Sequence, residues 1–517
     1  MSKTKRNQEK NNRKLFKINF KRLKKRVQGI TLIALVVTVI VLLILAVVAI
    51  NLTVGDNGLF KRAQNAVQVS EDSEILEELN IKMADYEIGK EAGTETRTLS
   101  EFLKDEFELE AIKETKYGTL IFKIGNKIIT AYKDNTLEIK DYQKNTIANN
   151  APMVASQVDT ELTEEDGFLT DDGIARKYIK KIIFNDNKEI PSSYNISWDV
   201  SELADGSVMA YASGDESNGY DVTIVSDGEI YLPENSTSLF EYCGYNESLP
   251  EYEIVFTGVN TSKVKTMHNM FCRFGYYSMT NFSIGDDFDI SNVTDMEGMF
   301  GYCGYNAMTK LDLGNNFDTS NVSIMTSMFW NCGYKAMTSL NLGDKFNTSN
   351  VTLMDGMFGH CGYKAMTSLN LGDKFDTSNV NNMYDMFWNC GHDTMTNLNL
   401  GDKFDTSNVT NMFYIFNSCG YMSLIKLDLG DKFKTTNVTN MQGAFEDCGH
   451  TSMVEINLGN AFKESSQLSN ITRIFINCGT SNCKYYVNSA EGKEWLLNLN
   501  SSYRRNENWN EEYIFVQ

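Results

Sequence analysis

Apolar and polar positions recur at one fixed spacing through the second half of the chain. A Met-Phe pair, or its equivalent, returns every 29 residues and once after 30, with its aromatic ring at Phe271, Phe300, Phe329, Phe358, Phe387, Phe416, Phe445 and Phe475. A short apolar–polar–apolar–glycine segment, such as LDLG at 311–314, returns with the same period and predicts a β-strand. A repeat this regular predicts a solenoid, in which stacked units bury one another's apolar side chains.

The remainder of each unit has helical spacing. One unit places four apolar side chains at i, i+3, i+7 and i+10, on one face of a helix: Val293, Met296, Phe300 and Cys303. Glycine follows the cysteine, where a helix end favours a left-handed residue, and Thr294 with Glu297 fits a capping box. We therefore predict an α/β repeat solenoid whose units each contain a strand of a parallel sheet and a helix of about ten residues near 294–303.

Residues 30–50 form an uncharged apolar run of 21 residues, which at about 1.5 Å per residue spans roughly 30 Å of hydrocarbon. The leader, residues 1–29, carries twelve Lys and Arg against the single acid Glu9. The positive-inside tendency keeps this leader in the cytoplasm and places the chain after Asn51 outside. A secretory signal peptide would have a shorter apolar region and a small-residue cleavage site, so we predict a single-pass membrane helix over 30–52.

The junction LKKRVQGITLIALVV resembles the cleavage site of type IV prepilins, and NLTVGDNGLFKRAQNAV after it looks like pilin-type proteins of Gram-positive anaerobes. The resemblance implies that a prepilin peptidase cuts between Gly29 and Ile30 and that the apolar helix is retained. Most major pilins carry a glutamate where this chain has Ala34. This difference favours processing over assembly as the main subunit of a filament.

Residues 53–145 predict a helical stalk and a small α+β domain similar in plan to a minimal pilin head. Apolar side chains at helical spacing predict a helix over 63–89, and residues 98–107 predict a short helix with Ser100 as a candidate N-cap. Alternation over 118–142 predicts two or three strands joined at 125–126 and 134–135. The acidic, turn-rich residues 146–177 predict a linker.

The repeated pattern GDKFDTSNVTNMxxMFxxCGY resembles the BspA-type leucine-rich repeat surface proteins, over about 239–478. The units of this chain are longer than the usual version. The resemblance implies an entry flank at 178–238, repeats at 239–483 and a closing segment at 484–517, in which Trp495 and Trp509 would cover the last unit.

One cysteine falls at the same place in successive units and predicts a structural ladder: Cys303, Cys332, Cys361, Cys390, Cys419, Cys448 and Cys478. A metal or disulfide role is the alternative, but no His or acid stands at ligand spacing, so we expect buried thiols. Cys478 and Cys483 are the one pair that could close a local loop. The N-V-T and N-V-S tripeptides, as at Asn292, are better explained as turns than as glycosylation sites, and Asp344 lacks the oxygen spacing of a calcium loop.

Charge and motifs restrict the function. Residues 30–517 carry −20 − 11 = −31 charges, which disfavours a nucleic-acid partner. The histidines, His268, His360, His392 and His450, occupy variable repeat positions, and no hydrolase, metalloprotease or phosphate-binding motif is present in the sequence. We expect neither an enzyme nor a cofactor or metal.

Two exposed sets remain as candidate binding groups. One is a strand ladder of amides and carboxylates: Asp312, Asn341, Asn370, Asn399, Asp428 and Asn457. The other is an aromatic row after the glycine: Tyr305, Tyr334, Tyr363 and Tyr421. They favour a cell-surface adhesin that binds an extracellular protein or glycan, although simple solvation of the solenoid explains them equally well. The alternative function is a minor pilin or pseudopilin that contacts other pilus subunits.

Overall fold

The computed structural model describes residues 59–109, 112–114, 120–124, 127–131, 137–141, 162–169, 173–202, 206–249, 252–256, 258–285, 288–463, 467–504 and 509–517. The chain divides into two compact units, Met1–Glu106 and Phe107–Gln517. The predicted cleavage site at Gly29 and Ile30, the apolar run 30–50 and Ala34 lie outside the described residues. Among the described residues, no helix has the length and apolar character needed to cross a membrane.

The first unit contains two helices in its described part, α3 (Leu59–Glu91) and α4 (Leu99–Glu106), as the helical spacing predicted. The rings of Tyr86 on α3 and Phe102 on α4 pack with centroids 5.4 Å apart. Thr98, rather than Ser100, caps α4: its hydroxyl accepts the N–H of Glu101 at 3.2 Å, while the Glu101 carboxylate accepts the N–H of Thr98 at 2.8 Å. This reciprocal pair is a capping box.

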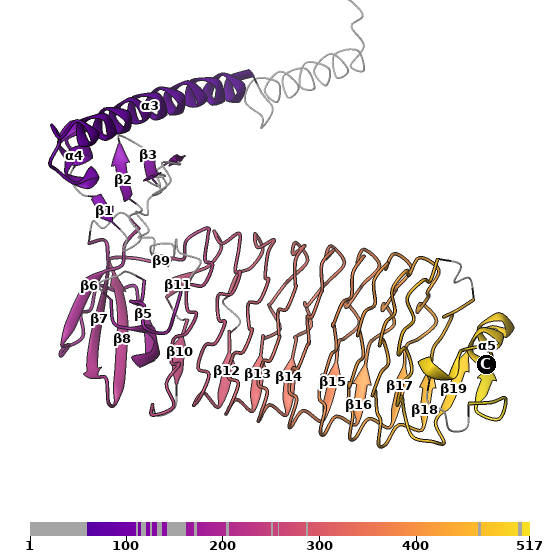
Figure 1. The fold of residues 1–517 in the computed structure, drawn as a ribbon. Coiled ribbons are helices and arrows are strands. Elements are labelled where there is room, and N and C mark those ends of the chain that lie inside the picture. The colour runs from indigo at the N-terminus through magenta and orange to yellow at the C-terminus, as the bar shows by residue number, and fades with distance from the viewer. Residues whose placement is uncertain are drawn as a thin grey trace, which may run out of the picture. The chain divides into compact units, whose positions relative to one another are not determined.

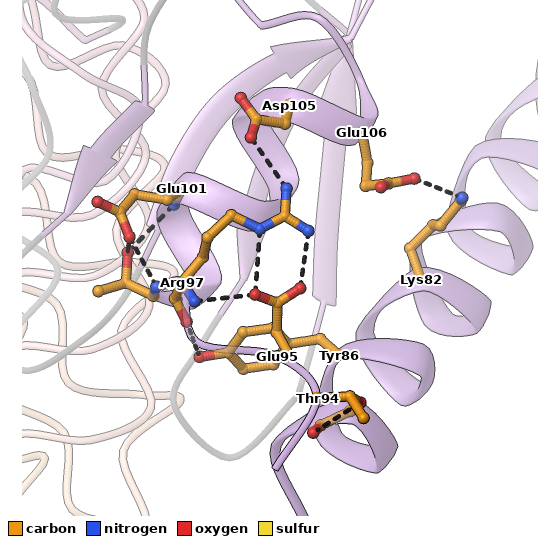
Figure 2. A network of polar contacts seen from close by, with 10 residues as sticks. Lys82, Tyr86, Thr94, Glu95, Arg97, Glu101, Asp105 and Glu106 are labelled. Atoms are coloured by element: carbon orange, nitrogen blue, oxygen red, sulfur yellow. Dashed lines mark hydrogen bonds and ion pairs between the residues drawn. The ribbon is translucent and has the colours of Figure 1, made fainter. Parts of the chain in front are cut away.

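A polar network ties the connection between α3 and α4 (Figure 2). Arg97 donates to both carboxylate oxygens of Glu95 and to Asp105, and Lys82 on α3 pairs with Glu106 at 2.6 Å. The Arg97 guanidinium lowers the pKa of Glu95 to about 2. These contacts are exposed or only partly buried, so they orient the two helices more than they stabilise them.

The second unit begins with an antiparallel sheet in the order β1–β2–β3–β4, formed by Ile112–Glu114, Leu120–Ile124, Lys127–Ala131 and Leu137–Asp141. Strands β2 to β4 confirm the predicted alternation, and the antiparallel pairing of Ile124 with Lys127 makes β2 and β3 neighbours, as expected. Strand β1 was not predicted.

The entry flank is a mixed sheet in the order β10–β5–β8–β7–β6. Its strands are β5 (Ile179–Asn185), β6 (Ile196–Asp199), β7 (Val208–Asp215), β8 (Gly219–Ser226) and β10 (Glu253–Val255). Residues 162–169 and 173–177, predicted as linker, pack into its core. The side chain of Phe168 is fully buried, and its backbone carbonyl accepts the indole N–H of Trp198 at 3.1 Å. The sequence did not predict this packing because the segment is acidic and has few apolar residues.

The repeats form a parallel solenoid whose short strands stack in one row (Figure 1). The described strands are β9 (Ile230–Tyr231), β11 (Val259–Asn260), β12 (Asn281–Ser283), β13 (Lys310–Asp312), β14 (Ser339–Asn341), β15 (Ser368–Asn370), β16 (Asn397–Asn399), β17 (Lys426–Asp428), β18 (Glu455–Asn457), β19 (Lys484–Val487) and β20 (Ile514–Val516). Leu311 pairs with Leu340, and Leu369 with Leu398, so each rung advances by 29 residues. The predicted parallel strands and solenoid are confirmed.

The predicted helix in each unit is wrong. Within the described residues 288–463 no α-helix forms, and residues 294–303 make consecutive turns instead. The N–H groups of Gly298 and Phe300 donate to the next rung, while those of Gly301 and Cys303 close turns three residues back. Positive φ at Gly298 (60°) and Tyr302 (57°) makes this alternation possible and is incompatible with a helix. Every second N–H therefore bonds between rungs, so the backbone is satisfied without a helix.

Buried columns of identical side chains form the core. The repeat phenylalanines stack ring on ring from Phe240 to Phe475, with centroids 5.0–5.7 Å apart. A buried threonine column adds polar ties between rungs: Thr377 donates its hydroxyl to the carbonyl of Asp405 at 2.8 Å and accepts the N–H of the same residue at 2.7 Å.

Both ends of the stack are covered. At the start, the 3₁₀ turn η1 (Arg176–Tyr178) places the fully buried Arg176 against the first rung. At the end, helix α5 (Ala490–Leu497) and the turn η2 (Ser501–Tyr503) carry the closing segment. Trp495 stacks on Phe462 at 3.9 Å and Trp509 packs on Phe475 at 5.6 Å, so both tryptophans cover the final rung as predicted.

Candidate functional site

A continuous stack of partly exposed rings follows the solenoid; we refer to it as the aromatic row. It consists of Tyr245, Tyr276, Tyr305, Tyr334, Tyr363, His392, Tyr421 and His450. From Tyr276 to Tyr421 the centroids lie 4.4–4.8 Å apart and the planes within 11° of parallel. The structure thus brings the four predicted tyrosines into one surface.

The backbone fixes the spacing of this row. Each ring follows a glycine with positive φ, such as Gly304 (54°), where a Cβ would lie 2.3 Å from the Cβ of Met308. The next N–H then donates to the ring residue of the preceding rung, as Lys335 does to the carbonyl of Tyr305 at 2.9 Å. The rings therefore inherit the separation between rungs. Partial burial raises the pKa of Tyr276 to about 12, so the row keeps neutral phenols at physiological pH.

A second aromatic group borders the row, formed by Trp330, His360 and Trp388. The centroid of the His360 ring lies 4.5 Å from that of Trp388. It lies 6.2 Å from the centroid of Tyr334 and 6.1 Å from that of Tyr363. Burial, with a smaller effect of His392, lowers the pKa of His360 to about 4, so this imidazole is neutral at pH 7. We refer to the aromatic row and these three side chains together as the aromatic face.

A glycine makes the tryptophan pair possible. Trp330 and Trp388 stand two rungs apart, yet their ring centroids lie 5.7 Å from each other. Gly359 occupies the same column on the rung between them, and a Cβ there would lie 2.3 Å from the ring of Trp330. The two indoles therefore close over a position that has no side chain.

Charged groups flank the aromatic face. Lys364 lies over the Tyr363 ring at 4.9 Å and pairs with Asp393 at 2.8 Å. Asp393 also contacts Nδ1 of His392 at 2.6 Å. These side chains place hydrogen-bond donors and acceptors beside the rings, which is how binding sites combine stacking with orientation.

The side chains of the strand ladder form hydrogen bonds within the solenoid. Asn341 donates its amide to Asp312, as Asn399 does to Asn370 and Asn457 to Asp428, each at 2.9 Å. Each of these six side chains also accepts the N–H of the glycine two residues on, at 3.0–3.2 Å. Much of the hydrogen-bonding capacity of the ladder is therefore used for its own turns.

The cysteine column lies wholly inside. All seven predicted members, together with Cys243, Cys272 and Cys483, are buried. Burial raises the pKa of Cys303 and Cys332 well above the usual value, so both stay protonated thiols. The tripeptide asparagines join adjacent rungs, a role that the sequence did not predict: the amide of Asn292 donates to the carbonyl of Ser262 on the preceding rung at 2.7 Å. Asp344 lies exposed at a turn.

Half of the aromatic row was missed from the sequence. His392 and His450 occupy the tyrosine column but looked like variable positions, and Tyr245 and Tyr276 belong to the less regular first rungs. The available signal was the repeat register itself, since both histidines follow the same Cys-Gly pair as the tyrosines.

The chain is a repeat solenoid of stacked 29-residue rungs. Its candidate site is a surface formed by a column of partly exposed rings, and no short sequence motif defines it. Residues 246–368, 309–423, 334–458 and 362–486 each match the family model described as Mycoplasma protein of unknown function, DUF285. These overlapping matches support a repeat protein of the BspA and Mycoplasma type over the solenoid. No curated protein and no solved structure gives a match.

Proposed function

We propose that this chain is a cell-surface binding protein that displays its solenoid outside the cell and holds an extended ligand, a glycan or a peptide, on the aromatic face without catalysing a reaction. The observation that carries this proposal is the continuous ring stack from Tyr276 to Tyr421 beside the Trp330–Trp388 pair. Rigid aromatic side chains offer a large contact area at a low cost in conformational entropy, and Trp and Tyr dominate binding hot spots.

The repeat geometry favours an elongated ligand over a compact one. Rings recur at 4.4–4.8 Å, so one contact can be renewed on each rung. Lys364 and Asp393 provide a cation and an anion at the edge of the rings, where hydroxyls or amides of a ligand can pair. By comparison, the strand ladder has fewer groups left to offer a ligand.

Binding of the full chain, displayed on cells, to immobilised glycans and matrix proteins tests the proposal. Replacing Trp330 and Trp388 by alanine should weaken binding at least about tenfold, or ~1.4 kcal/mol. Tyr194→Ala is the matched control, because Tyr194 is an exposed aromatic outside the face (48% exposed). Unchanged affinity of the tryptophan variant, with the wild-type protein binding a ligand, would assign that ligand to another surface.

Surface display has its own test. The +11 leader and the apolar run 30–50 support an internal N-terminus and an external solenoid. Protease added to intact cells should digest the repeats and spare an N-terminal tag. Repeats that resist protease until the cells are lysed would contradict display at the surface.

Processing at Gly29 is part of the same proposal. A prepilin peptidase would yield a protein that begins at Ile30, retains its apolar run and lacks residues 1–29. Substituting a bulky residue for Gly29 should leave the leader attached, whereas Ala34→Glu should not change cleavage. Mass spectrometry of the membrane-extracted protein distinguishes these species, and an intact leader in peptidase-positive cells would refute processing.

A further inference from the structure

Three side chains with metal-binding chemistry meet near the start of the solenoid. His268 and Glu297 stand 29 residues apart, in one column on adjacent rungs, and Asp295 precedes Glu297 by two residues on the same edge. One imidazole nitrogen and one oxygen from each carboxylate lie within 4.8 Å of one another. All three side chains are partly buried, which restricts their motion.

The other rungs show what the fold itself needs at position 295. The neighbouring rungs hold the uncharged Thr266, Ile324 and Leu353 at this position. Asparagines follow at Asn382, Asn411 and Asn440, and each of their side-chain oxygens accepts the N–H two residues on, at 3.1–3.3 Å. Asp295 makes the same bond to the N–H of Glu297 at 2.9 Å. An amide oxygen is therefore sufficient for this turn. The second carboxylate oxygen of Asp295 accepts only a long hydrogen bond, 3.4 Å, from the hydroxyl of Thr266.

That extra charge appears where the neighbouring column supplies His268 and Glu297. On later rungs the column holds Thr326, Asp355, Tyr384 and Phe413, of which only Asp355 has a side chain that commonly binds metals. In the described part of the chain, neither the Asp295 nor the Glu297 carboxylate pairs with a lysine or arginine. Two carboxylates held together without a cationic partner repel each other, and a bound cation relieves that repulsion.

We propose that His268, Asp295 and Glu297 bind one divalent transition-metal ion, of which Zn²⁺ is the best fit. Imidazole nitrogen with two carboxylate oxygens is a donor set suited to Zn²⁺, whereas Ca²⁺ and Mg²⁺ prefer oxygen alone. Three protein ligands leave an open position for water or for an oxygen atom of another molecule. The Asp295 oxygen that accepts the Glu297 N–H fixes the carboxylate in place, as outer contacts do in other metal sites.

Titration of the full-length, EDTA-treated protein with ZnCl₂, followed by calorimetry, tests this site. The wild-type protein should take up Zn²⁺ saturably, and Asp295→Asn should lower the affinity at least about tenfold while circular dichroism stays unchanged, since asparagine serves other rungs. Glu297→Gln and His268→Asn should do the same. Asp405→Asn is the matched control, because Asp405 forms a similar turn to the N–H of Ser407 away from the cluster.

Two further measurements make the outcome decisive. Co²⁺ bound to the wild-type protein should give stronger visible d–d bands than aqueous Co²⁺, and the His268 variant should lose or shift these bands because one ligand is removed. Lowering the pH from 7.5 to 5 should weaken Zn²⁺ binding, since the imidazole must be deprotonated to bind. Equal Zn²⁺ affinity in the wild-type and Asp295→Asn proteins, or binding of Ca²⁺ in preference to Zn²⁺, would overturn the proposal.

Discussion

Arg176 is fully buried where the solenoid begins, and its Nη1 donates to the carbonyl oxygens of Ser238 (3.2 Å), Leu239 (3.2 Å) and Glu241 (2.8 Å). On the second rung the equivalent carbonyls, of Met270 and Cys272, accept N–H groups from the rung before. The first rung has no preceding rung to supply these donors. The guanidinium therefore takes the place of a missing rung.

Replacing Arg176 by methionine should preserve most of the volume and remove these donors. Two buried carbonyls, of Leu239 and Glu241, would lose the partner that the stack otherwise provides, at about 1–3 kcal/mol each. Part of this loss is offset because burial disfavours the charged guanidinium, as the lowered pKa of Arg176 indicates. We expect a net destabilisation of roughly 2–5 kcal/mol.

The effect should also be local, because each rung of a solenoid contacts only its neighbours. Hydrogen exchange followed by mass spectrometry should show lost protection at residues 238–245 and little change near Phe387. Lys265→Met is the control, since Lys265 makes an exposed ion pair with Glu234 near the same end and should cost about 1 kcal/mol or less. Uniform loss of protection, or equal effects of the two variants in urea, would refute the capping role of Arg176.

Three shorter predictions concern the rungs themselves. Thr377→Val should cost about 1–3 kcal/mol in urea unfolding, because the buried hydroxyl bonds both backbone groups of the next rung, whereas the exposed Thr396→Val should cost less. Gly359→Ala, at ordinary φ, should displace the Trp330 ring and shift the tryptophan fluorescence; an unchanged spectrum would contradict the close packing. Burial raises the pKa of Asp385 to about 7. The protonated group therefore stabilises the fold fully below its unfolded pKa near 4, and this stability is lost as the pH rises through 7. Asp385→Asn should flatten the fall in the free energy of unfolding over this pH range, and parallel curves for the two proteins would refute the prediction.

The sequence predicted the period, the strands and the closing tryptophans but not the path between strands. Buried residues at 293, 296, 300 and 303 suit a helical face, and they suit a chain of tight turns equally well. The distinguishing signal was in two other columns. Gly298 and its equivalents Ser327 and Asp385 all have positive φ, as do Asn331 and Asn389 in the column of Tyr302. Glycine, asparagine and aspartate tolerate this conformation, so their recurrence inside a helical pattern argues for turns.

The candidate site was only partly predictable, since a strict repeat makes every column look equally important. Columns that vary least, such as the phenylalanines and cysteines, are buried and follow from packing alone. The strand amides vary little because each bonds to its neighbour along the row, a use that spacing does not reveal. The informative positions are those where a surface column departs from the repeat. Trp330 and Trp388 do so beside Gly359, and Asp295 does so in a column whose other residues are uncharged. At these positions the fold accounts for the residues found on the other rungs, but it does not account for Trp330, Trp388 or Asp295. These three side chains are therefore where binding should be sought.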